Sequence, residues 1–272
     1  MYTAAWAASG YAAAHSRPGP IAHFFERRIE TVAQLLRDVP GGPLLDAGSG
    51  PGMMVRHLVD RRPGDFEITA LDRSEAMIDE ARTVLGDDMD GVKLCVGNIE
   101  RMPFPAATFD AVLAMGVLEY VDVVAALREV ARVTRPGGVA VVTMLNPRSP
   151  YRIWERFVHH PVCRARAIGE RLLGVPRERR RGAARNCAEV LGEEHLARLV
   201  RAVGLHPVST VYFDFNPLPP PIDHLVADIA VAAERRLARL AGTPVRRLGS
   251  SFALGCRREG PPTTATAPAR TG

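Results

Sequence analysis

The feature that most constrains the fold is an alternation of short apolar segments with helical apolar spacing along the first half of the chain. The short segments, which we expect to be strands, are 44–47, 66–71, 92–96, 109–115 and 139–145. Between them, apolar residues recur every three or four positions, as on one face of a helix. The last segment is apolar throughout, which is typical of a parallel strand buried on both faces. Repeated strand–helix–strand units predict a doubly wound α/β sheet with right-handed crossovers.

The second half of the chain predicts further elements and two segments outside the alternation. A helix is expected at 193–203, and strands are expected at 208–215 and 251–257. The end of the chain is polar and rich in proline and threonine, a composition that predicts disorder. The expected organisation is one domain over 1–258, an N-terminal cap at 1–39, lid insertions at about 148–185 and 216–250, and a disordered tail at 259–272.

The positive charge of the chain is concentrated in the first insertion. The 272 residues carry 35 basic and 30 acidic side chains, and Lys93 is the only lysine. Segment 148–185 holds 11 arginines and three glutamates, so it carries +8 while the rest of the chain carries −3. Three interpretations are open: a lid helix over the substrate, a site for an anionic substrate or carrier, or a contact with a membrane surface or RNA.

Composition also excludes several classes of protein. No apolar run approaches the ~18 residues that a membrane-spanning helix needs. The alanine-rich N-terminus lacks the basic start of a signal peptide. The four cysteines are far apart and form no C-x-x-C pair, so we expect free thiols, with neither a disulfide framework nor a metal site. These features predict a cytoplasmic protein.

A glycine-rich loop joins the first expected strand to the first following helix, where residues 44–52 read LLDAGSGPG. Glycines 48 and 50 allow a tight turn and a close approach of a ligand to the main chain. The dinucleotide fingerprint would place its third glycine at Met53, and the loop lacks the Gly-Lys-Ser/Thr ending of a phosphate-binding loop. Asp46 would repel a pyrophosphate and favour a cationic ligand group.

A second acid follows the second expected strand. Asp72 lies 22 residues after Gly50, at the position where a carboxylate can bind both hydroxyls of a ribose. The loop and this acid together predict a ligand that has a ribose, a positive charge and no phosphate. S-adenosylmethionine has all three properties.

With these residues in place, the chain resembles the class I S-adenosylmethionine-dependent methyltransferases, especially the branch of ubiquinone/menaquinone-biosynthesis and natural-product methyltransferases. The resemblance is close over 40–146 and looser over 186–258. Four motifs carry it in order: LLDAGSGPG (44–52), ALDRSEAM (70–77), VGNIERMPFP (96–105) and LREVARVTRPGGVAVVT (127–143). It implies a mostly parallel, seven-stranded, Rossmann-like sheet with an antiparallel last strand and helical lid insertions.

The resemblance also implies a set of cofactor contacts. These are Tyr11, Asp46, Ala47, Gly48, Ser49, Gly50, Asp72, Arg73, Met77, Asn98, Ile99 and Met115. In that set the glycine loop lines the methionine part of the cofactor, with Asp46 near its amino group. Asp72 holds the ribose, Asn98 and Ile99 read the edge of the adenine, and Tyr11 closes over the cofactor.

The remaining implied contacts are Arg73 and Met77, which flank the adenine, and Met115, which lies under the sulfonium. The chain departs from its relatives at two positions. Relatives usually carry Asp in place of Asn98, whose amide oxygen can still accept from the adenine amine, so we expect binding to survive. They often carry His in place of Tyr120, so no role of that His transfers to this chain.

No pattern in the sequence assigns a general base. His23, His159 and His160 lie in segments expected to cover the site, and a histidine near its usual pKa is a natural base for a hydroxyl group. Methyl transfer to an activated acceptor can proceed with little more than proximity and alignment. The three histidines are therefore candidates only, and Glu119 is interpreted as a structural residue or a solvated charge at a helix start.

Three functions follow from these observations. The first is S-adenosylmethionine-dependent methyl transfer to a small-molecule acceptor, either a secondary metabolite or a quinone- or lipid-like compound. The second is a nucleic-acid methyltransferase, which the sequence MGVL at 115–118 disfavours because amino-methylating enzymes carry an Asn/Asp-Pro-Pro-aromatic run there. The third is an S-adenosylmethionine-binding protein without methyl transfer, such as a scaffold subunit or a cyclase. The acceptor atom and the oligomeric state stay open.

Overall fold

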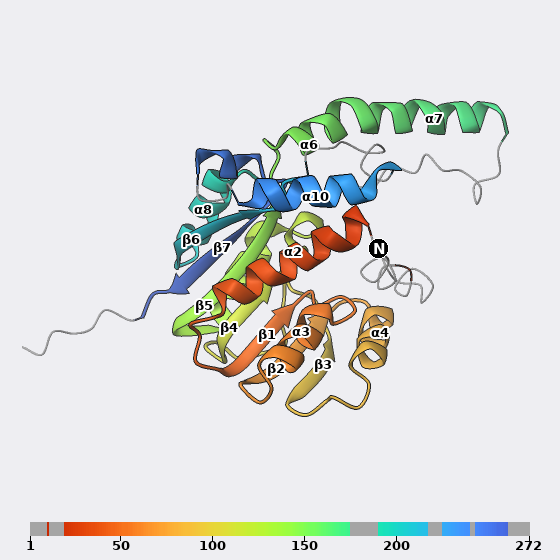
Figure 1. Ribbon diagram of the computed structural model, residues 1–272. Helices are drawn as coiled ribbons and strands as arrows, with labels where there is room; N and C mark the ends of the chain where they lie inside the picture. Colours follow the sequence, from red (N-terminus) through yellow and green to blue (C-terminus); the bar gives the residue numbers. More distant parts are fainter. Residues whose placement is uncertain (1–9, 11–18, 175–189, 217–224, 240–242, 261–272) are drawn as a thin grey trace, which may run out of the picture.

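The computed structural model describes residues 10, 19–174, 190–216, 225–239 and 243–260 (Figure 1). Its centre is a seven-stranded sheet with the order β3-β2-β1-β4-β5-β7-β6. The strands are β1 (Gly42–Ala47), β2 (Phe66–Asp72), β3 (Val92–Val96), β4 (Phe109–Ala114), β5 (Thr134–Leu145), β6 (Leu205–Phe213) and β7 (Ser251–Arg258). The first five are mutually parallel, and β7 is antiparallel to both β5 and β6. This topology confirms the predicted fold class.

Helices cover both faces of the sheet. They are α2 (Pro20–Leu35), α3 (Met53–Arg61), α4 (Glu75–Leu85), α5 (Val123–Val133), α8 (Glu193–Ala202) and α10 (Ala227–Ala238). Helices α5 and α8 contribute apolar side chains to one buried cluster, and α2 and α3 contribute to a second cluster. Because the sheet separates the two clusters, the central strands β1, β4 and β5 contribute buried residues to both faces, which explains their apolar sequences.

Side-chain caps define where two of the helices begin. The Ser74 hydroxyl accepts from the Met77 N–H at 3.4 Å, as expected for the N-cap of α4, and Asp122 accepts from the Ala125 N–H at 2.9 Å at the start of α5. Each such cap contributes on the order of 1 kcal/mol to helix stability. On α5, the apolar residues Leu127 and Val130 then face the core and are fully buried.

Strand β5 begins earlier than expected. We predicted a break at the Arg-Pro-Gly-Gly sequence and a strand from 139, but the strand starts at Thr134. Thr134 is buried and pairs with Phe109, whereas residues 135–137 are exposed, and the pairing with β4 shifts register between Phe109 and Ala111. Gly137 has a left-handed φ of 79° in this irregular stretch, as is common at a bulge.

The first insertion is helical but is divided. It contains α6 (Pro150–Trp154), the π-helical turn η2 (Glu155–His159) and α7 (His160–Leu172), which we call the basic arm (150–172). In Figure 1 the arm lies above α10 and extends away from the sheet. Short 3-10 turns occur at η1 (Leu118–Tyr120) and η4 (Pro244–Leu248). Among the described residues, no helix is both long and apolar enough to cross a membrane.

Candidate cofactor site

The glycine loop follows β1 at the carboxyl edge of the sheet. Gly48 and Gly50 have φ values of 83° and 55°, a conformation that residues with a β-carbon rarely adopt. A β-carbon on Gly48 would also lie 2.6 Å from the Cγ2 atom of Val117. The Gly48 N–H donates to the Leu71 carbonyl at 2.7 Å, so the loop is fixed against the end of β2. Both glycines are therefore required by the backbone path.

Asp46 is the most unusual group at this edge. It is fully buried at the end of β1, and neither carboxylate oxygen has a hydrogen-bond partner in the part of the chain that the structure describes. Burial and, to a lesser extent, the nearby Asp72 carboxylate raise the pKa of Asp46 to about 7, although the charge of Arg28 opposes this shift. An unpaired buried carboxylate is costly, so its position indicates a site that a donor or a cation completes.

Asp72 connects the glycine loop to the start of α4. Its Oδ2 atom accepts from the Gly50 N–H and its Oδ1 atom accepts from the Ser74 N–H, both at 2.9 Å. Each carboxylate oxygen keeps a second lone pair for a ligand hydroxyl, so a ribose can still bind. Of the two residues predicted to flank the adenine, Arg73 is exposed and Met77 is buried. Asp72 therefore has a structural role beside the predicted ligand role.

Asn98 forms a local turn after β3. Its side-chain oxygen accepts from the Glu100 N–H at 3.0 Å, and its Nδ2 atom donates to the Glu100 carboxylate at 3.2 Å. The residue is exposed, whereas the neighbouring Ile99 is buried. The other oxygen of Glu100 accepts from the Asp122 N–H at 2.8 Å, which links this turn to the start of α5. The predicted contact of Asn98 with adenine thus requires the second lone pair of an oxygen that already accepts one bond.

The other predicted contacts lie close along the same edge. Ala47 and Ser49 are buried, and the Ser49 hydroxyl has no partner among the described residues. Met115 is half-buried after β4 and packs against the core cluster that includes α2 and α3. The Gly116 N–H, next in the chain, donates to the Thr143 hydroxyl at 2.9 Å. Tyr11 lies outside the described residues.

Arg28 is a site residue that the sequence analysis missed. It is buried on α2, its guanidinium carbon lies 5.5 and 4.9 Å from the ring centroids of Phe24 and Phe25, and its Nε atom has no partner among the described residues. Its charge lowers the pKa of both Asp46 and Glu119. The sequence pattern does mark this residue as unusual, because Arg28 interrupts the apolar face of helix α2.

Glu119 is not the solvated charge that one interpretation of the sequence allowed. It is buried, and its Oε1 atom accepts from the Leu145 N–H at 3.1 Å. Its Oε2 atom has no partner in the described part of the chain. Burial raises the pKa of Glu119, and the charges of Arg28 and Arg152 partly oppose that shift. The residue therefore holds the end of β5 and contributes to the electrostatics of this edge.

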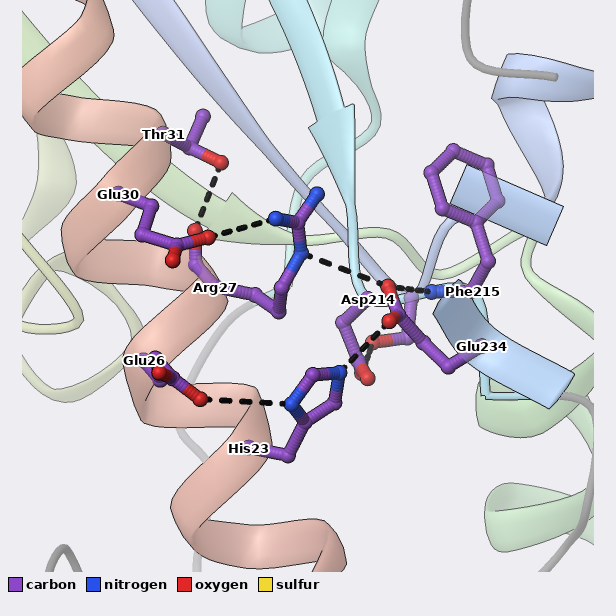
Figure 2. A network of polar contacts seen from close by, with 9 residues as sticks. His23, Glu26, Arg27, Glu30, Thr31, Asp214, Phe215 and Glu234 are labelled. Atoms are coloured by element: carbon purple, nitrogen blue, oxygen red, sulfur yellow. Dashed lines mark hydrogen bonds and ion pairs between the residues drawn. The ribbon is translucent and has the colours of Figure 1, made fainter. Parts of the chain in front are cut away.

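His23 connects two helices that are far apart in the sequence. Its Nε2 atom lies 2.6 Å from Oε2 of Glu234 on α10, and its Nδ1 atom lies 3.5 Å from the Glu26 carboxylate (Figure 2). The hydrogen bond with Glu234 raises the pKa of His23. Because both ring nitrogens face carboxylates, the arrangement favours a charged imidazole that holds α10 against α2.

Polar groups around Glu234 extend this network. Its Oε1 atom accepts from the Phe215 N–H at 3.4 Å and lies 3.6 Å from Nε of Arg27 (Figure 2). Asp214, at the end of β6, is buried and accepts from the Ser250 hydroxyl. Burial raises the pKa of Asp214. The network therefore joins the N-terminal helix, the end of β6 and the second insertion.

His159 and His160 lie on the basic arm. The Nε2 atom of His159 lies 3.5 Å from the Cys163 sulfur, and that of His160 lies 3.9 Å from the Glu155 carboxylate. These contacts stay within the arm, and the structure gives neither histidine a contact with the glycine loop. The salt bridge between Arg152 and Glu155, at 2.6 Å, likewise lies within the arm, and the Arg152 side chain is 19% exposed.

Comparison with known proteins places the site in a family. Residues 45–142 match a family model described as a methyltransferase domain. The sheet order, the glycine loop and the acid after β2 define the class as a Rossmann-like domain with an adenosine-type site at the carboxyl edge. Residues 45–142 thus resemble the class I S-adenosylmethionine-dependent methyltransferases, and the same comparisons support S-adenosylmethionine as the cofactor.

Two curated relatives illustrate the likeness. The chain is 38% identical over 107 residues to the malonyl-[acyl-carrier protein] O-methyltransferase of Serratia marcescens. This alignment covers 39% of each of the two chains. The chain is 35% identical over 120 residues to a ubiquinone/menaquinone biosynthesis C-methyltransferase of Geobacter sulfurreducens. That alignment covers 43% of this chain and 46% of the relative. The match therefore spans less than half of the length of either relative.

A solved structure extends the comparison of folds. The geranyl diphosphate C-methyltransferase of Streptomyces coelicolor, in complex with Mg²⁺, geranyl diphosphate and S-adenosylhomocysteine, has a TM-score of 0.53 and 18% sequence identity. The alignment covers 85% of this chain and 78% of that chain. At this identity the likeness concerns the fold.

Proposed function

We propose that the chain binds S-adenosylmethionine at the glycine loop and transfers its methyl group to a small-molecule acceptor. The observation that carries this proposal is the fully buried Asp46 carboxylate, which has no protein partner among the described residues, as is also true of the Ser49 hydroxyl three positions later. An ammonium group is the ligand that such a carboxylate favours. S-adenosylmethionine carries such an ammonium group together with a ribose and a carboxylate, and the resemblance to methyltransferases makes it the expected ligand.

The residues around the loop fit the rest of that ligand. Arg28 is a buried cation close enough to Asp46 to lower its pKa and suits the cofactor's carboxylate, while Asp72 suits the ribose hydroxyls. The predicted neighbours of the adenine are Met77, Asn98 and Ile99. The bound cofactor supplies an electrophilic methyl group on a sulfonium. The protein's part is to hold that group, exclude water and align the acceptor.

We further propose that the basic arm and α10 act as lids of one domain over 1–258. Both segments follow strands that end at the carboxyl edge, and His23 and Glu234 hold α10 over α2. We propose a quinone- or lipid-like acceptor, or a related secondary metabolite. Support comes from the exposed apolar residues of both segments and from the relative named for ubiquinone and menaquinone biosynthesis.

The test is calorimetric titration of S-adenosylmethionine into the wild type and Asp46→Asn. We expect the variant to bind at least tenfold more weakly, while its ligand-free melting temperature stays equal or rises, because an unpaired buried charge is removed. Asp110→Asn is the matched control, since Asp110 is an exposed partner of Arg135. Equal affinity in wild type and Asp46→Asn would contradict the proposed site.

Catalysis requires a separate measurement. Release of S-adenosylhomocysteine is followed with a panel of hydroquinones that differ in the length of their apolar tail. Turnover that increases with tail length supports the proposed acceptor class. Cofactor binding without turnover on hydroquinones or on other small hydroxylated compounds would favour a cofactor-binding protein that transfers no methyl group.

A further inference from the structure

The basic arm has an unusual surface for a helix of an α/β domain. None of the residues of α6, η2 or α7 is buried. Helix α7 has 13 residues and extends away from the sheet (Figure 1). The sheet therefore gives this helix little of the packing that normally stabilises an amphipathic helix.

Apolar side chains gather on one side of α7. Val162, Ile168 and Leu172 are 61%, 56% and 83% exposed, and Leu173 follows directly after the helix with 83% exposure. At 100° per residue, these side chains and Ala165 fall within one face of the helix. Contiguous exposed apolar surface of this kind marks a site of interaction.

Arginines border that apolar face. Arg164 and Arg166 lie on its two sides, and Arg171 lies next to Arg164 on the polar side of the helix. All three are exposed, and of them Arg166 pairs with Glu170. An apolar face bordered by cations is typical of a helix that lies in the interface of an anionic membrane.

Helix α10 also exposes apolar and basic side chains. Ile229 is 63% exposed beside the exposed Asp228, and Arg235, Arg236 and Arg239 are exposed toward the end of the helix. In Figure 1 this helix lies beneath the arm, at the same end of the molecule. Arginines thus predominate among the exposed charges of α7 and of the end of α10, and like charges oppose the docking of these parts onto each other or onto a second copy. The complementary surface is negative and accepts apolar side chains.

We propose that the basic arm and the outer face of α10 dock onto the surface of an anionic phospholipid bilayer. The apolar side chains of α7 enter the boundary between headgroups and acyl chains, and the arginines contact lipid phosphates. Nucleic acid fits this surface less well, because it offers no apolar layer for Ile168, Leu172 and Leu173. The inference stands without the proposed methyl transfer, and it would place the lids where a lipid-like acceptor is dissolved.

The test is co-sedimentation of the full chain with vesicles. One set contains phosphatidylcholine alone, and the other contains phosphatidylcholine with about 30% phosphatidylglycerol, whose negative surface attracts basic segments. We expect at least tenfold stronger binding to the anionic set and a loss of binding as salt is raised, because screening shortens the range of the charges. Equal binding to both sets would overturn the proposal.

Two variants test the two parts of the surface. Leu172→Asp with Leu173→Asp removes apolar contacts, and Arg164→Glu with Arg171→Glu reverses charge; each should reduce binding at least tenfold. The matched controls are Val208→Asp on β6, where Val208 is 64% exposed, and Arg128→Glu on α5, where Arg128 is exposed. Unchanged binding of the arm variants, or equal losses in the controls, would overturn the assignment to the arm.

Tryptophan fluorescence gives a second, independent readout. In a Trp6→Phe background, Trp154 on α6 is the remaining tryptophan. We expect a blue shift of its emission, and quenching by brominated lipid, when anionic vesicles are added. An unchanged spectrum, or a salt-sensitive RNA complex at 150 mM salt without vesicle binding, would refute the membrane assignment and support nucleic acid instead.

Discussion

Arg28 lies against Gly116 so closely that a β-carbon on the glycine would be 2.1 Å from the Nη1 atom of the arginine. The two residues are distant in the chain, one on α2 and the other in the loop after β4. Gly116 also has a left-handed φ of 64°. The missing β-carbon therefore makes room for a buried cation beside Asp46 and Glu119.

This contact predicts that Gly116→Ala weakens cofactor binding through Arg28. The new methyl group displaces the guanidinium, and we expect a loss of about tenfold in affinity for S-adenosylmethionine. The strained φ adds a cost on the order of 1 kcal/mol to folding. In an Arg28→Ala background, the same substitution should lose the effect on affinity and keep only the folding cost. Additive losses of affinity would contradict the coupling.

The raised pKa of Asp46 predicts a pH dependence of cofactor binding. The cofactor's ammonium pairs with the ionised carboxylate, whose pKa in the free protein is about 7. Affinity for S-adenosylmethionine should therefore increase as the pH rises from 5.5 to 7, by a factor that approaches ten per pH unit well below the pKa. Calorimetric titration at several pH values measures the effect. Asp46→Asn should give a flat profile over this range.

The His23–Glu234 pair predicts a pH dependence of stability. The pKa of His23 is raised, so its contribution is complete below its unfolded pKa of about 6.5 and disappears as the pH rises through the folded pKa. The pKa of Glu234 is lowered, so its contribution disappears as the pH falls through its own folded pKa. We expect His23→Gln to lower the melting temperature by several degrees at pH 6 and by less at pH 9. A constant difference would argue against an ion pair.

Substitution of Asp72 should affect both the stability of the fold and the binding of the ribose, and the two effects can be measured separately. Asp72→Asn has a single acceptor oxygen in place of two, so one bond from Gly50 or Ser74 weakens, at a cost of roughly 2 kcal/mol in unfolding free energy. S-adenosylhomocysteine and its 2′-deoxy analogue test the ribose contact. Wild type should prefer the hydroxylated ligand, and the preference should shrink in the variant. If both proteins show the same preference, Asp72 has only the structural role.

Much of the fold is determined by local sequence. The apolar segments from 44 to 145 predicted five strands of the parallel sheet, and Ser74 predicted the start of α4. The glycine loop was also readable, since its φ values of 83° and 55° at Gly48 and Gly50 permit few other residues. These features follow from burial and backbone sterics within a few residues, so they are visible along the chain.

The charges at the carboxyl edge depended on tertiary structure. Arg28 reaches the loop after β4 because α2 packs over that end of the sheet, and His23 meets Glu234 across 211 positions of sequence. The sequence predicted a helical lid at the first insertion, but the π-helical turn that divides it is seen only in the structure. The sequence by itself thus determined the strands of the parallel sheet, the path of the glycine loop and the expected cofactor, S-adenosylmethionine. Only the tertiary structure decided which buried charges lie together, because that depends on contacts between residues far apart in the chain.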